Sequence, residues 1–150
     1  MLAAPPAGAS RTGDVVDDLR FRNQQGAEIR IGELRGRVVV LYAFTSTHAS
    51  ARDTLDRLSR LDSRSDCELV VLALSLDRDP RDLARLVQSV RPEVAMLLDS
   101  SGELAASLEV GESPVAFVLD RRGAIRQRRA LRTHDEFSAL EASVASLLDE

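Results

Sequence analysis

One continuous apolar run constrains the fold of this chain more than any other feature. Residues 37–44 read Arg-Val-Val-Val-Leu-Tyr-Ala-Phe, and the polar triplet Thr-Ser-Thr follows directly. Such a run is typical of a strand that is buried on both faces at the centre of a sheet. A charged segment with leucines at helical spacing begins at Asp53. The run therefore predicts a central strand that leads through a short polar loop into a helix, an arrangement that often carries an active site.

The apolar segments around this run predict the other strands. Residues 17–22 and 28–31 flank Asn-Gln-Gln-Gly, which is a hairpin signal. A short turn that ends in Gly36 then precedes the central strand. Further strands are predicted, in chain order, at residues 68–76, 115–120 and 124–129, and residues 94–98 form a short segment of no assigned type.

Helical spacing and capping residues predict the helices between these strands. A capping box, Thr133-x-x-Glu136, precedes the last one, and Asp79-Pro80 begins another. The predicted helices are residues 53–62, the segment from Asp79 to Pro92, the segment from Ser100 to about Leu108, and the segment after Thr133. Strands that alternate with helices, followed by a hairpin and a closing helix, predict an α/β sandwich with a mixed central sheet.

Length and charge limit the classes of function. The chain of 150 residues has room for one domain with a substantial core. Residues 1–13 are rich in Ala, Pro, Gly and Ser and are expected to be a flexible lead-in to a domain at residues 14–150. A net charge of −4 gives no general attraction to nucleic acid or anionic membranes. No stretch has the length of an apolar membrane span, and the N-terminus lacks a signal-peptide pattern, so a cytoplasmic location is expected. The alternative is a domain of a longer exported or anchored protein, which would show the same pattern.

Three segments carry a resemblance to a known family. The first resembles an N-terminal hairpin that leads into a central strand, the second an active-site loop, and the third a cis-proline loop with its strand and hairpin; they are residues 17–40, 44–49 and 110–123. In this order they resemble the thioredoxin-like proteins. More narrowly, the chain is similar to TlpA/ResA-type thiol:disulfide oxidoreductases and their AhpC/TSA, or peroxiredoxin, relatives. The resemblance implies a thioredoxin-like fold over residues 14–150.

The resemblance also shows which chemical groups are missing. In that family a Cys-x-x-Cys pair stands at the start of the first long helix, where N–H groups and the helix dipole stabilise a thiolate. The matching residues here are Ala49-Ser-Ala-Arg52, and His48 replaces a tryptophan. The acidic positions of the family fall at Ala43 and Leu55. Dithiol exchange through this loop is therefore excluded, and a peroxidatic cysteine is absent too, because its place is held by Ala49.

Pro114 is the part of the family's site that this chain keeps. The resemblance places Pro114 in the cis-proline loop, facing the altered motif, where the family pairs its backbone with an extended substrate peptide. This implies a partner-binding face made of His48, Ser50, Ser113 and Pro114. The alternative is that Pro114 forms a purely structural turn.

Other reactive residues favour structural interpretations. His48 and Ser50 suggest a nucleophilic pair, but no acid is identifiable to orient the histidine, so a solvated loop histidine is the preferred interpretation. His48 and His134 lack the neighbouring ligands of a metal site, so neither a metal nor another cofactor is expected. Cys67 is the single cysteine of the chain and stands just before a predicted strand, as a structural thiol does.

Arginines crowd the predicted C-terminal hairpin. This arginine cluster consists of Arg121, Arg122, Arg126, Arg128, Arg129 and Arg132. It is consistent with an anion-binding surface or with a charged edge strand that resists aggregation. Asp62, Asp66, Asp77 and Asp79 are the acids considered as its neutralising partners.

These observations favour a binding function over catalysis. The leading hypothesis is a redox-inactive thioredoxin-like module that binds a protein or peptide partner and needs no nucleic acid. The alternative is a thiol-disulfide oxidoreductase or peroxiredoxin-like enzyme whose cysteine is replaced at Ala49, naturally or by engineering. A third option is a scaffold whose arginine cluster docks on an acidic partner.

Overall fold

The fold is an α/β structure built on one mixed sheet. A computed structural model describes residues 20–23, 27–64, 68–90, 94–98 and 114–149. Within these residues seven strands pair in the order β2-β1-β5-β4-β3-β6-β7. They are β1 (Arg20–Asn23), β2 (Glu28–Arg30), β3 (Val38–Phe44), β4 (Leu69–Ser75), β5 (Ala95–Leu98), β6 (Val115–Leu119) and β7 (Ile125–Ala130).

Three α-helices and one 3-10 turn accompany the sheet in the described part of the chain. They are η2 (Ile31–Leu34), α1 (Ala51–Arg64), α2 (Pro80–Val90) and α4 (His134–Leu148). The helix predicted at residues 100–108 lies outside the described residues, as do Cys67 and Ser113. The other predicted helices and strands are present, with ends shifted by a few residues.

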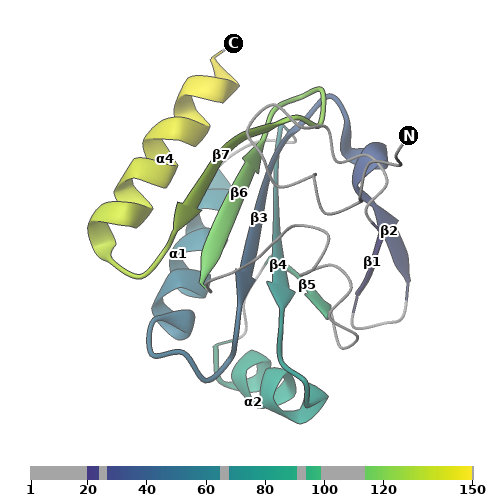
Figure 1. Cartoon of the computed structure of the whole chain (residues 1–150), viewed down its shortest axis with the longest axis vertical. Coiled ribbons are helices and arrows are strands. Elements are labelled where there is room, and N and C mark those ends of the chain that lie inside the picture. The colour runs from purple at the N-terminus through teal and green to yellow at the C-terminus, as the bar shows by residue number, and fades with distance from the viewer. Residues whose placement is uncertain (1–19, 24–26, 65–67, 91–93, 99–113, 150) are drawn as a thin grey trace, which may run out of the picture.

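The strand expected to be central is central. β3 pairs in parallel with β4 and antiparallel with β6, and all seven of its residues are buried. β4 pairs in parallel with β5, and β1 pairs antiparallel with β5 and β2. In Figure 1 the arrowheads of β3 and β4 point to the end of the sheet at which α2 lies. The loop after β3 therefore sits at that end.

Local chemistry explains how the elements begin and turn. Gly36 has φ +93°, a left-handed conformation suited to glycine, and its N–H donates to the carbonyl of Arg121 at 2.8 Å. The predicted capping box of α4 is confirmed, since the Thr133 side chain accepts from the N–H of Glu136 and the Glu136 carboxylate accepts from the N–H of Thr133. Asp79 caps α2 by accepting from the N–H of Arg81 at 2.9 Å, as expected of an N-cap residue.

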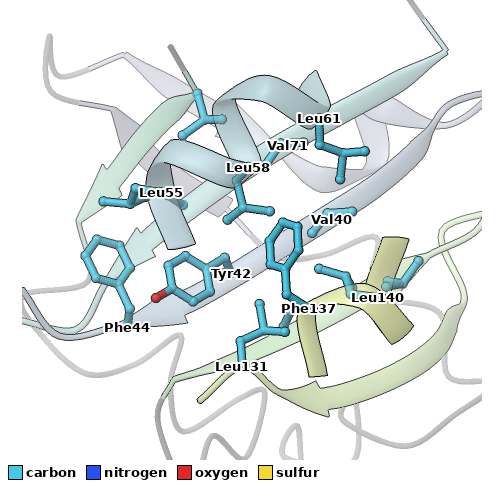
Figure 2. Packing of buried hydrophobic residues seen from close by; sticks show 14 of the residues in the cluster. Val40, Tyr42, Phe44, Leu55, Leu58, Leu61, Val71, Leu131, Phe137 and Leu140 are labelled. Atoms are coloured by element: carbon cyan, nitrogen blue, oxygen red, sulfur yellow. The ribbon is translucent and has the colours of Figure 1, made fainter. Parts of the chain in front are cut away.

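The larger of two buried clusters lies between the sheet and its helices. Side chains of α1 and α4 pack onto alternate residues of β3, and Figure 2 shows Leu58 of α1 and Phe137 of α4 meeting over Val40. The opposite face of the sheet buries the other alternate residues, including Leu41 and Phe117. A strand covered on both faces must be apolar throughout, which accounts for the uninterrupted run at residues 38–44.

Candidate functional site

The sheet topology gathers several segments at one end. β3 and β4 are parallel, so the residues that follow Phe44 and Ser75 emerge together. β6 runs antiparallel to β3 and pairs Val115 with Ala43, so Pro114 reaches the same end. The loop at residues 45–50, the segment after β4 and Pro114 thus converge where the resemblance places a binding face.

Turns at residues 45–51 lead directly into α1. The N–H of His48 donates to the carbonyl of Thr45 at 3.1 Å, and the N–H of Ala51 donates to the carbonyl of His48 at 3.1 Å. The first helical bond joins the N–H of Thr54 to the carbonyl of Ser50 at 2.9 Å. Both ends of the altered motif, Ala49 and Arg52, are exposed. The former motif therefore remains accessible at a helix start.

His48 and Ser50 contact each other in this loop. Nδ1 of His48 accepts from the N–H of Ser50 at 3.2 Å and lies 2.8 Å from its hydroxyl oxygen. A backbone N–H can only donate, so Nδ1 is the acceptor in its contact with the N–H of Ser50. In the part of the chain that the structure describes, no carboxylate is hydrogen-bonded to His48. The third member of a nucleophilic triad is therefore missing from these residues, and the contact ties the loop to the helix start.

The buried Asp77 anchors the loop from the protein side. The sequence did not predict this role. Its carboxylate accepts from the backbone N–H of Ser46 at 2.9 Å, from the hydroxyl of Ser46, and from the hydroxyl of Ser75 at 2.6 Å. Asp77 is only 5% exposed. A buried carboxylate that is satisfied by several donors rigidifies the segments that supply them. The signal available in the sequence was an acidic residue directly after a buried strand.

An open hollow lies between this loop and α2. We call it the loop hollow; its volume is about 430 Å³. Its lining includes His48, Ala49 and Arg52 on one side and Asp82, Arg85 and Leu86 on the other. Both ends of the altered motif therefore face a space that a partner's side chain could enter.

Two stacked aromatic rings support the loop from the core. The rings of Tyr42 and Phe44 lie parallel with centroids 5.0 Å apart, and both side chains are fully buried (Figure 2). The hydroxyl of Tyr42 makes no hydrogen bond of ordinary geometry within the described residues. Burial raises the pKa of Tyr42 far above its usual value, an effect that the nearby Thr54 side chain offsets only in part.

Comparison with known families identifies the chain. The model of the AhpC/TSA family matches residues 12–128. The chain belongs to this family. Its single cysteine means that this AhpC/TSA protein lacks the Cys-x-x-Cys pair. No curated protein sequence matches the chain.

Solved structures establish the thioredoxin-like fold of this AhpC/TSA protein. A putative thiol:disulfide interchange protein DsbE from Chlorobium tepidum is similar with a TM-score of 0.86 and 21% identity, over 92% of this chain and 98% of that one. A putative protein disulfide isomerase from Bacteroides thetaiotaomicron has a TM-score of 0.82 and 20% identity, over 93% of this chain and 91% of that one. A secreted disulfide oxidoreductase from Mycobacterium tuberculosis has a TM-score of 0.69 and 18% identity, over 84% of this chain and 96% of that one. At these identities the likeness shows the fold alone.

Pro114 lies at the loop end of the sheet, and its carbonyl oxygen already accepts a hydrogen bond within the protein. Pro114 is buried, and its carbonyl oxygen accepts from the N–H of Leu131 at 3.1 Å. Proline has no N–H, so backbone pairing with a partner at this point would have to come from Ser113. Ser113 lies outside the described residues, and the predicted cis peptide bond before Pro114 stays a prediction.

The arginine cluster is largely engaged within the protein. The guanidinium of Arg121 donates to the carbonyls of Leu147 and Leu148 at 3.1 and 3.3 Å, which satisfies the C-terminal end of α4. Arg128 lies 5.4 Å from the ring centroid of Phe117, and Arg132 pairs with Glu136. β7 is an edge strand of the sheet. These contacts support the charged-edge interpretation of the cluster.

The acid that neutralises this cluster differs from those considered. Asp77 is buried beneath the loop and Asp79 pairs with Arg81 at 3.0 Å, so neither serves the hairpin. Asp62 and Asp66 have no described side chains. Asp120 instead contacts Arg122 and Arg126 at 3.4 and 3.5 Å. Asp77 and Asp79 follow β4 at the end of the sheet where β3 ends. The turn between β6 and β7 lies at the opposite end, because Leu119 pairs with Val39 near the start of β3.

Asp120 predicts a pH dependence of stability. Burial raises the pKa of Asp120, but hydrogen bonds from the N–H groups of Ala124 and Arg122 outweigh that effect and hold the pKa below its usual range. A lowered pKa in the folded state means that the ionised carboxylate adds stability above about pH 4, and that this stability is lost as the pH falls through the folded pKa.

Asp120→Asn is accordingly expected to lower the free energy of unfolding at pH 7 by about 1–2 kcal/mol. The difference from the wild type should shrink below about pH 4. Urea unfolding at several pH values measures both, with Asp135→Asn, at an exposed position of α4, as the control. A difference that stays constant down to acid pH would contradict the assignment.

Metal binding and membrane insertion receive no support from the described residues. His48 and His134 do not come together with a third ligand, since no group of three or more His, Cys, Asp or Glu side chains suited to a metal is found there. Nδ1 of His134 contacts the guanidinium of Arg57 instead. Among the described helices, none has the length and apolar character that crossing a membrane requires.

Proposed function

We propose that this AhpC/TSA-family protein is a redox-inactive binding module that holds an extended segment of a protein partner at the loop end of its sheet. The face would comprise His48 and Ser50 on the loop together with Ser113 and Pro114. One observation carries the proposal: the place of the reactive thiols holds Ala49 and Arg52, which are exposed at the start of α1 beside the loop hollow.

The anchoring of the loop supports this proposal. Asp77 fixes Ser46 through its backbone N–H and hydroxyl, and Ser50 fixes the ring of His48. A surface held in one conformation loses little conformational entropy when it binds, which favours affinity. A loop of small polar residues without such contacts would have to be ordered by the partner.

A blocking substitution tests partner binding. Ala49→Trp places a large ring at an exposed position of the loop hollow and leaves the core untouched. Partners captured by the wild type from a lysate of the source organism should be lost with Ala49→Trp. They should be retained with Ala145→Trp, which changes an exposed position on α4. Unchanged capture by Ala49→Trp, with an unchanged melting temperature, would contradict the proposal.

An activity assay separates this proposal from the enzyme alternative. The wild type is expected to show neither insulin reduction nor peroxide consumption, because no cysteine stands at the start of α1. A variant with Ala49→Cys and Arg52→Cys is expected to gain disulfide reductase activity, since helix N–H groups there would stabilise a thiolate. Activity of the wild type in either assay would refute the redox-inactive function.

A further inference from the structure

The loop hollow carries unbalanced positive charge. Arg52 and Arg85 line it, and Asp82 is the acid among its described lining residues, so two positive charges face one negative charge. His48 also lines the hollow, and its Nδ1 is occupied by Ser50. The hollow is therefore more suited to an anionic group than to a cationic one.

Arg52 has no partner among the residues that the structure describes. Its side chain is exposed on the first turn of α1 and has no ion pair or hydrogen bond among the described residues. Later arginines on the same helix differ: Arg57 pairs with Asp53 at 3.2 Å and Arg60 with Asp56 at 2.8 Å. A guanidinium presents a planar fork of donors that matches a carboxylate.

Arg85 is available as a second contact from the opposite wall. It meets Asp82 at 3.7 Å, and the two side chains are 77% and 36% exposed. An ion pair so long and so exposed contributes little and is readily exchanged. An incoming carboxylate could thus draw Arg85 away from Asp82 without a large loss.

The buried Asp77 is not among the residues that line the hollow. It is held beneath the loop by Ser46 and Ser75, which already donate to its carboxylate. Arg78, the next residue, is exposed and has no ion pair among the described residues. A carboxylate that enters the hollow would therefore contact Arg52 and Arg85 and not Asp77.

We propose that the loop hollow binds an aspartate or glutamate side chain of the partner, with Arg52 as the principal contact and Arg85 as the second. The proposal rests on the function proposed above, because it needs an extended protein segment at this end of the sheet. It adds the chemistry by which that segment is chosen: an acidic residue placed so that it enters the hollow beside Ala49.

Peptide pools of defined charge test whether the hollow prefers an acidic side chain. Three fluorescent pools of nine-residue peptides would carry a central Glu, Gln or Arg, with uncharged residues varied at all other positions. Fluorescence anisotropy should show that the Glu pool binds the wild type about tenfold more tightly than the Gln pool, and the Arg pool most weakly. Arg52→Gln should abolish the preference, Arg85→Gln should reduce it, and Arg60→Gln should keep it.

Each outcome decides between the two proposals. Equal binding of the Glu and Gln pools, still lost with Ala49→Trp, would overturn the carboxylate site and leave the binding module standing. A preference for Glu that survives Arg52→Gln would overturn the assigned contact. Failure of all three pools to bind the wild type would count against both proposals.

Discussion

Replacing Asp77 with alanine is expected to lower the free energy of unfolding by about 3 kcal/mol. The carboxylate is 5% exposed and accepts hydrogen bonds from the backbone N–H and hydroxyl of Ser46 and from the hydroxyl of Ser75. Alanine would leave these donors without their acceptor, and the N–H of Ser46 has no rotamer by which to find another. Guanidinium chloride unfolding measures the loss.

The same substitution should loosen the loop as well as the whole fold. Hydrogen exchange at the amide of Ser46 is expected to speed up more than exchange in β6, which Asp77 does not contact. Asp77→Asn keeps one carbonyl acceptor in nearly the same shape and should cost less than alanine. Asp53→Ala, at an exposed position of α1, should change stability by no more than about 0.5 kcal/mol. If Asp77→Ala were as stable as the wild type, Asp77 would not have this anchoring role.

Replacing Phe44 with alanine is expected to cost about 4 kcal/mol. Phe44 is fully buried at the end of β3 and stacks on Tyr42 with ring centroids 5.0 Å apart. Figure 2 shows its ring on the same side of β3 as Leu55 of α1. Alanine would leave a cavity between the strand and the helix whose first turn presents Arg52. Thermal or denaturant unfolding measures the effect.

Phe44→Leu is the matched control for that cavity. Leucine restores most of the removed volume, and such a change usually costs about 1 kcal/mol. If leucine and alanine destabilised the protein equally, the loss would come from the aromatic stack with Tyr42 and not from the cavity. Stability of Phe44→Ala within about 1 kcal/mol of the wild type would contradict the packing described for this end of the core.

The sequence was sufficient for the elements whose signals are local. Seven apolar residues in succession indicated a strand buried on both faces, and β3 is such a strand. The residue types Thr133 and Glu136, three positions apart, indicated a capping box, and the hydrogen bonds are present. Burial periodicity and capping depend on neighbouring residues, which are visible in the chain itself.

The candidate site was only partly predictable, because its contacts join distant segments. The positions of Ala49, Arg52 and Pro114 at one end of the sheet followed from the resemblance, and strand pairing brings Pro114 to the loop. The loop hollow could not be foreseen, since it needs the relative placement of α1 and α2. Arg121 likewise gave no sign that it would cap the end of α4, 26 residues away.

The amino-acid sequence by itself determined the fold class and the absence of a Cys-x-x-Cys pair, because buried strands need apolar runs and dithiol exchange needs two cysteines. Tertiary structure alone decided which charged side chains find a partner within the protein and which do not. It buried Asp77 under Ser46, 31 positions away, and brought Arg121 to the carbonyl of Leu147, 26 positions away. It left Arg52 unpaired among the described residues. Charges interact through space, and only the packed sheet and helices set those distances.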